Sequence, residues 1–205
     1  MFSKSRSSMT FALLAVGFVT SIASTATAAS FPGSYSTSFG ATNVQRCPAL
    51  PPDQIRIIKP MPTTNPCLGR GTSLVALSKF HLLYVCENEV AVDNYDIAIG
   101  SQGTGKTVEG DRKTPIGVYS LGTPRKSDLF GFFIPIGYPT RAQAARGFTG
   151  EAVGIHGPVR DFRCVGFLNV VFDWTAGCVA VADDGYVARI AKWVKAHPKA
   201  TITIL

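Results

Sequence analysis

After residue 72, the apolar residues of this chain come in short runs that polar residues, glycines and prolines interrupt. Each run has the length of a strand, and several alternate between apolar and polar residues. We therefore predict a mainly β domain with a sandwich or barrel-like sheet. The predicted strands lie in the segments SLVALS, FHLLYVC, VAVDNYDIAIG, TPIGVYSLG, FGFFIPIGY, AVGIHG, FLNVVF and ATITIL.

Two segments have helical features instead. Residues 140–147 (TRAQAARG) form a short helix candidate that ends on a glycine. Residues 183–197 (DDGYVARIAKWVKAH) carry apolar residues at helical spacing, with acids at the start and bases at the end, as the helix dipole prefers. The sequence thus predicts one or two helices beside the sheet.

The N-terminus has the layout of a secretory signal peptide. Lys4 and Arg6 precede an apolar run from Met9 to about Ala23, and a small-x-small cleavage pattern ends at Ala28. An uncleaved anchor is the alternative. We predict a signal peptide over 1–28, an irregular extension over 29–72, and a catalytic domain over 73–205, located in the periplasm or secreted to the cell envelope. The basic residues are scattered, so nucleic acid is not an expected partner.

The stretch GSQGTGKT, residues 100–107, matches the letters of a phosphate-binding P-loop. In a P-loop the lysine opens a helix, but Lys106 leads into a segment interrupted by Gly110, Pro115 and Gly117. Export would also keep the protein away from ATP. We predict a loop between strands and no bound nucleotide.

Two residues stand out as a catalytic pair. Cys178 directly follows a glycine, which permits a sharp turn beside a substrate, and a thiol nucleophile needs a base. His156 ends an apolar run between two glycines, whereas His81 and His197 have structural or solvated contexts. The alternative is that Cys178 joins a disulfide and another cysteine is free. An odd count leaves at least one unpaired among Cys47, Cys67, Cys86, Cys164 and Cys178.

Three blocks in the order IAIGSQGTGKTVEGDRKTPIGVYSL, GIHG and DWTAGCVAV resemble the L,D-transpeptidases with a YkuD-type catalytic domain. The resemblance covers about residues 73–205. It implies a mainly β, YkuD-like β-sandwich or mixed sheet with one or two helices, and a catalytic cysteine on a loop near the C-terminal helix.

The resemblance also implies a mechanism. Cys178 would be the nucleophile, His156 its base, and the Gly157 carbonyl the group that orients the imidazole. The N–H groups of Ala176, Gly177 and Cys178 would form the oxyanion hole. The thiol would displace D-alanine from a peptidoglycan stem tetrapeptide, and an amine of a second stem or of a wall-attached protein would take the acyl group. No metal or organic cofactor is implied.

Two departures from the family pattern concern the grip on substrate. Ala176 stands where many members have a second histidine, and Ala180 stands where many have an arginine. They leave open two alternatives: an L,D-carboxypeptidase or amidase that hydrolyses stem peptides, and a non-catalytic wall-binding module. The further candidates for substrate contact are Thr175, Trp174, Tyr138 and Arg160, while Asp111, Lys113 and Thr114 are expected to shape their loop.

The segment between His156 and Cys178 is long for the family and contains Cys164. Four cysteines allow three pairings. We favour a Cys86–Cys164 bridge that pins this segment, with Cys47–Cys67 holding the extension.

Overall fold

The computed structural model of the protein describes residues 61–205. The predicted signal peptide and residues 29–60 of the predicted extension lie outside the described residues, so these predictions stay predictions. Within the described part, no helix is long and apolar enough to cross a membrane.

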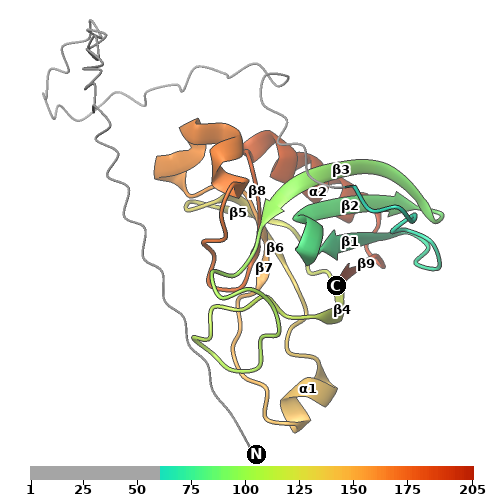
Figure 1. Ribbon diagram of the computed structural model, residues 1–205, viewed down its shortest axis with the longest axis vertical. Helices are drawn as coiled ribbons and strands as arrows, with labels where there is room; N and C mark the ends of the chain where they lie inside the picture. The colour runs from blue at the N-terminus through green and yellow to red at the C-terminus, as the bar shows by residue number, and fades with distance from the viewer. Residues whose placement is uncertain (1–60) are drawn as a thin grey trace, which may run out of the picture. The chain divides into compact units, whose positions relative to one another are not determined.

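The described residues form a mainly β fold, as predicted (Figure 1). Two α-helices and two 3-10 helices accompany the sheet: η1 Ser78–Phe80, α1 Arg141–Ala145, η2 Arg160–Val170 and α2 Asp184–Ala196. The strands are β1 Ser73–Leu77, β2 Leu82–Glu87, β3 Val90–Ala98, β4 Gly117–Ser120, β5 Arg125–Ser127, β6 Gly131–Pro135, β7 Gly154–His156, β8 Val179–Val181 and β9 Thr201–Ile204.

The strands make one mixed sheet of nine, in the order β4-β9-β1-β2-β3-β8-β7-β6-β5. The long strand β3 joins its two halves, because β3 pairs with β2 along most of its length and with β8 only at Ile97 and Ala98. Two neighbouring pairs are parallel, β1 with β9 and β7 with β8. The β7–β8 pair positions the candidate site.

The main core lies where apolar side chains of the strands meet helix α2. Val187, Ile190, Ala191 and Val194 are the buried residues of α2, at the spacing the sequence predicted, and the helix packs against β6 and β8 (Figure 1). The Asp183 side chain accepts a hydrogen bond from the N–H of Tyr186 and caps the helix. Both predicted helices are therefore confirmed.

The segment FLNVVF is not a strand, so that prediction was wrong. Residues 160–170 form the 3-10 segment η2, which is kinked at Gly166, where φ is +54°. The Asn169 side chain replaces strand pairing: its amide donates to the carbonyls of Phe162, Gly166 and Ala182. An apolar run is ambiguous when one buried amide organises the backbone around it.

The favoured disulfide pairing was also wrong. Cys67 bonds to Cys86, with the Cα atoms 5.5 Å apart. The sheet register explains this pairing, because Ser73 lies opposite Cys86 and the turn that carries Cys67 runs directly into β1. Cys164 is disulfide-bonded too. The bridge therefore fixes the entry to the sheet rather than the segment between His156 and Cys178.

Candidate active site

Parallel pairing of β7 and β8 brings His156 and Cys178 onto neighbouring chain segments, two register positions apart. His156 is the last residue of β7, and Cys178 immediately precedes β8. The register places Ile155 opposite Val179 and His156 opposite Ala180. The two residues that the sequence singled out, 22 positions apart in the chain, thus sit on neighbouring strands at one place in the sheet.

A hydrogen-bonded turn holds Cys178 ahead of its strand. The buried hydroxyl of Thr175 donates to the carbonyl of Cys178 at 2.8 Å and accepts from the N–H of Gly177 at 3.1 Å. Gly177 has φ = +130°, and a Cβ atom there would lie 2.6 Å from the backbone oxygen of Lys113. Only glycine fits this position, as its place before the predicted nucleophile suggested.

His156 is buried, with 1 % of its surface exposed. Its Nδ1 lies 2.6 Å from the Gly157 carbonyl oxygen. A carbonyl only accepts, so Nδ1 carries the proton of the neutral ring and Nε2 is left as an acceptor. The Gly157 carbonyl therefore has the place that the family resemblance implied for it.

Aromatic rings surround the imidazole. Phe130 stacks on it with ring centroids 4.0 Å apart, and Trp174 meets it edge-on at 5.6 Å. Burial among these groups lowers the pKa of His156 from 6.5 to about 4, although the hydrogen bond with Gly157 acts in the opposite direction. The imidazole is accordingly neutral at pH 7, as a general base must be.

The Cys178 thiol is half-buried and free of any disulfide. Its Sγ lies 3.6 Å from the carbonyl oxygen of Ala152. Burial raises the pKa of this thiol, while hydrogen bonding by the Gly154 backbone and the positive charge of Lys106 lower it. The resting site therefore holds a neutral thiol beside a neutral imidazole.

The turn also offers backbone donors. The N–H of Gly177 is used by Thr175. Within residues 61–205, the N–H groups of Ala176 and Cys178 have no acceptor. These two amides are thus the free donors next to the thiol.

The other predicted contact residues have diverse positions. Trp174 is half-buried beside His156, and its indole N–H donates to the Asn169 carbonyl at 2.7 Å. Arg160 is exposed, and its Nε donates to the Asp128 carbonyl at 2.9 Å. Of these two candidates, Trp174 lies against the site, whereas the side-chain hydrogen bond of Arg160 is to neither His156 nor Cys178.

Thr175 and Tyr138 are buried instead. The Thr175 hydroxyl is used within the turn. The Tyr138 hydroxyl donates to the backbone carbonyls of Lys106 at 3.2 Å and Thr149 at 3.4 Å. Their observed contacts give both residues a packing role, which does not support the predicted contact with substrate.

Residues 100–107 form a loop between β3 and β4, as predicted, and no helix begins at Lys106. The loop folds back on itself, because the N–H of Gly105 donates to the Thr114 carbonyl at 2.9 Å. Farther along the same β3–β4 connection, the Lys113 carbonyl faces Gly177 in the turn that carries Cys178. The glycine-rich loop therefore supports the candidate site.

Sequence reasoning missed two residues near the candidate pair, His156 and Cys178. Phe130 gave no signal, because one phenylalanine among many apolar residues cannot be told from a core residue. Lys106 lies between Gly105 and Gly110 and is followed five positions later by Asp111. This spacing could have indicated an ion pair, but the match to a P-loop hid it. In the structure the Lys106 side chain is 4 % exposed and ion-pairs with that aspartate.

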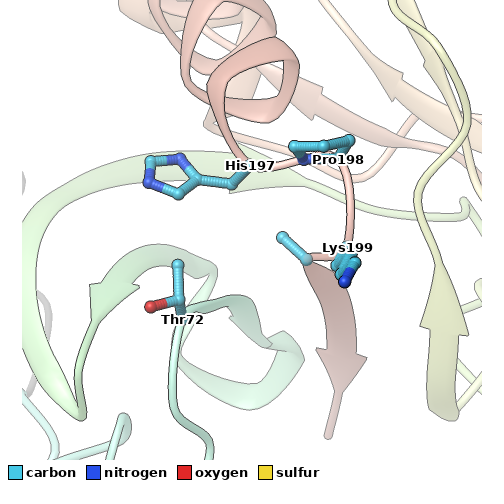
Figure 2. A pocket seen from close by; sticks show the side chains of 5 residues that line it. Thr72, His197, Pro198 and Lys199 are labelled. Atoms are coloured by element: carbon cyan, nitrogen blue, oxygen red, sulfur yellow. The ribbon is translucent and has the colours of Figure 1, made fainter.

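A surface hollow lies elsewhere in the fold. Thr72, His197, Pro198, Lys199 and Ala200 line it where the end of α2 meets the start of β9 (Figure 2). The Nδ1 atom of His197 lies 2.9 Å from the Trp193 carbonyl, so this histidine closes the helix end. Neither Cys178 nor His156 borders the hollow.

Comparison with known proteins gives this arrangement a family. The sequence pattern of the YkuD family, described as an L,D-transpeptidase catalytic domain, matches residues 70–204. The chain therefore belongs to the YkuD family of L,D-transpeptidase catalytic domains, as the sequence motifs indicated. Its domain is that of an L,D-transpeptidase-type cysteine enzyme.

Two solved structures are similar to parts of this chain, and the first of them shows the same fold. The helical cell shape determining protein Pgp2 from Campylobacter jejuni is 24 % identical, with a TM-score of 0.53 over 64 % of this chain and 46 % of that one. The catalytic domain of the Enterococcus faecium L,D-transpeptidase is 14 % identical, with a TM-score of 0.46 over 66 % of this chain and 98 % of that one. The chain thus spans less than half of the Pgp2 structure. No curated protein is similar enough to match.

Proposed function

We propose that this protein is an exported cysteine L,D-transpeptidase that acts on peptidoglycan stem tetrapeptides. The observation that carries the proposal is the β7–β8 register, which brings a free thiol at Cys178 to within two register positions of a buried, neutral imidazole at His156. A nucleophile, a base and an orienting group are the parts that acyl transfer by a thiol needs.

In the proposed first step, Nε2 of His156 takes the Cys178 thiol proton and Sγ attacks the carbonyl carbon of the amide before the terminal D-alanine. The carbonyl oxygen becomes an oxyanion, and the free N–H groups of Ala176 and Cys178 are its proposed donors. The C–N bond then breaks, the imidazolium returns the proton to the departing amine, and D-alanine leaves. A thioester on Cys178 remains.

In the second step, His156 removes a proton from an acceptor amine, and the amine nitrogen attacks the thioester carbonyl. The C–S bond breaks and the thiolate recovers the proton. An amine on the third residue of another stem gives a 3→3 cross-link, and an amine of a wall-attached protein gives a protein attachment. The periplasm or outer cell envelope is the proposed location, because the N-terminal sequence resembles a signal peptide.

Hydrolysis is the second candidate. Ala180 stands where many members of the family have an arginine, so the site lacks that positive charge. Ala180 has no exposed surface and packs in a small apolar cluster with Ala98 and Val170, beside Trp174. A larger residue at 180 would not fit there without displacing this cluster. If the acceptor stem is consequently held less firmly, water takes the acyl group and the enzyme is an L,D-carboxypeptidase.

Product analysis separates the candidates. Mature protein would be incubated with purified muropeptide tetrapeptides, beside a Cys178→Ala variant, and the products weighed by mass spectrometry. A cross-linked dimer that depends on Cys178 supports the transpeptidase, whereas a Cys178-dependent tripeptide without dimer supports the carboxypeptidase. Absence of both products in the native protein would contradict the proposed substrate and favour a wall-binding module.

A further inference from the structure

Lys106 is a buried lysine close to the turn of residues 175–178, which carries Cys178. The Lys106 side chain is 4 % exposed, and its Nζ donates to the Val108 carbonyl at 3.1 Å and to Oδ1 of Asp111 at 3.0 Å. An ammonium has three protons. The third has no acceptor within residues 61–205. A buried ammonium with an unused donor is costly unless a partner appears during function.

The Lys106 side chain packs against the turn that carries Cys178. A Cβ atom at Gly177, next to the nucleophile, would lie 3.7 Å from Cδ of Lys106. A Cβ atom at Gly150 would lie 3.5 Å from Nζ itself. Gly150 is two residues before Ala152, whose carbonyl faces Sγ of Cys178. The lysine therefore lies between the two segments that bracket the thiol.

The partner carboxylate does not cancel this positive charge at the thiol. Asp111 accepts from the backbone N–H groups of Thr107, Val108 and Lys113 as well as from Lys106. Burial alone would raise the pKa of Asp111, but these hydrogen bonds hold it well below its usual range. Asp111 is therefore ionised, yet it is the positive charge of Lys106 that acts on the pKa of the Cys178 thiol and lowers it.

We propose that Lys106 is a positioning residue whose ammonium stabilises the thiolate of Cys178 and thereby assists proton transfer to His156. The proposal rests on Cys178 being the nucleophile of the proposed enzyme. Asp111 holds the ammonium in place, and the glycine-rich loop brings Lys106 close to Cys178. In the resting protein the group lowers the pKa of Cys178, which is the direction that this role requires.

The charged and titratable groups around the thiol are few. Lys106 approaches from the glycine-rich loop with Asp111 behind it, and His156 approaches from β7. His156 is neutral at pH 7 because of its lowered pKa. Replacing Lys106 therefore removes the cation that, among the described residues, acts on the pKa of Cys178.

The test measures alkylation of Cys178 by iodoacetamide as a function of pH in the full chain, with its disulfides intact. Lys106→Met keeps the length of the side chain and removes the charge, whereas Lys106→Arg keeps the charge. Lys199→Met, at the hollow of Figure 2, is the control for the loss of one lysine charge elsewhere in the protein. We expect Lys106→Met to raise the midpoint by about one pH unit, so that alkylation at pH 7 is roughly tenfold slower.

The remaining variants separate charge from structure. Lys106→Arg and Lys199→Met should keep the native midpoint. A Lys106→Met variant that is slower by one factor at every pH, with an unchanged midpoint, would overturn the proposal. Thermal unfolding followed by circular dichroism checks that each variant is folded.

Alkylation requires no stem peptide, so its outcome is independent of the substrate assignment. The expected midpoint pattern together with no reaction on muropeptides would leave the Lys106 role standing and contradict the proposed function. Stem-peptide turnover together with an unchanged midpoint in Lys106→Met would do the reverse.

Discussion

Acidification should destabilise this protein through His156 in a way that a single variant can isolate. The pKa of His156 is lowered from 6.5 to about 4 in the folded protein, chiefly by burial. Between these two values the unfolded chain binds a proton at this site and the folded chain does not. The stabilisation is therefore complete above about pH 6.5, is lost as the pH falls toward 4, and changes no further below that.

The magnitude follows from the gap between the two pKa values. At about 1.4 kcal/mol per pH unit, the gap corresponds to about 3 kcal/mol of unfolding free energy between pH 7 and pH 4. In His156→Gln this contribution is absent. The difference in unfolding free energy between native protein and variant should consequently shrink by about 3 kcal/mol over this range.

Urea unfolding followed by tryptophan fluorescence at several pH values from 7 to 4 measures this difference. Both proteins share every other titrating group. Subtracting their unfolding free energies at each pH therefore leaves only the pH dependence that comes from residue 156. A difference that stays constant from pH 7 to pH 4 would refute the reasoning, because it would mean that the imidazole takes up its proton equally well in the folded and unfolded chains.

Three further changes have defined outcomes. Gly177→Ala places a Cβ atom 2.6 Å from the Lys113 carbonyl at φ = +130°, so urea unfolding should show a loss of about 2 kcal/mol, and an unchanged stability would contradict the tight turn. The double variant Cys67→Ser and Cys86→Ser opens a loop with a separation of 19 residues and should lower the stability by about 3 kcal/mol, while reductant should destabilise the native protein more than the variant, which keeps the disulfide of Cys164. Asn169→Ala removes three backbone contacts and should increase hydrogen exchange in residues 160–170, whereas exchange equal to that of the native protein would show that Asn169 does not organise the segment.

The sequence was most informative where one residue type has one physical use. Gly177 has a positive φ that excludes a side chain, His156 ends the run that forms β7, and Cys178 immediately precedes the run that forms β8. The C-terminal helix was equally predictable, because its apolar spacing and its Asp183 cap are local signals.

Other features depend on contacts between distant segments and left no local trace. The Cys67–Cys86 pairing follows from the β1–β2 register, which no count of cysteines reveals. The 160–170 segment looked like a strand because its run of apolar residues hid the kink at Gly166 and the hydrogen bonds of Asn169. Which segments end up beside a residue is a property of the folded sheet.

The burial of Lys106 is the clearest case of this kind. A lysine in a glycine-rich loop is exposed by default. Here the loop packs against residues 175–178, and Asp111 compensates the buried positive charge of Lys106. Both events require the completed fold, so the role of this lysine became visible only with the structure.

The central claim is that Cys178 forms a covalent acyl-enzyme with a stem peptide, and intact-protein mass spectrometry tests it most directly. Mature protein would be mixed with a stem tetrapeptide, quenched in acid within seconds, and weighed beside Cys178→Ala. The account predicts an added mass equal to the tetrapeptide less D-alanine, located on Cys178 by peptide mapping and absent from the variant. An adduct on another residue, or turnover that persists in Cys178→Ala, would contradict it.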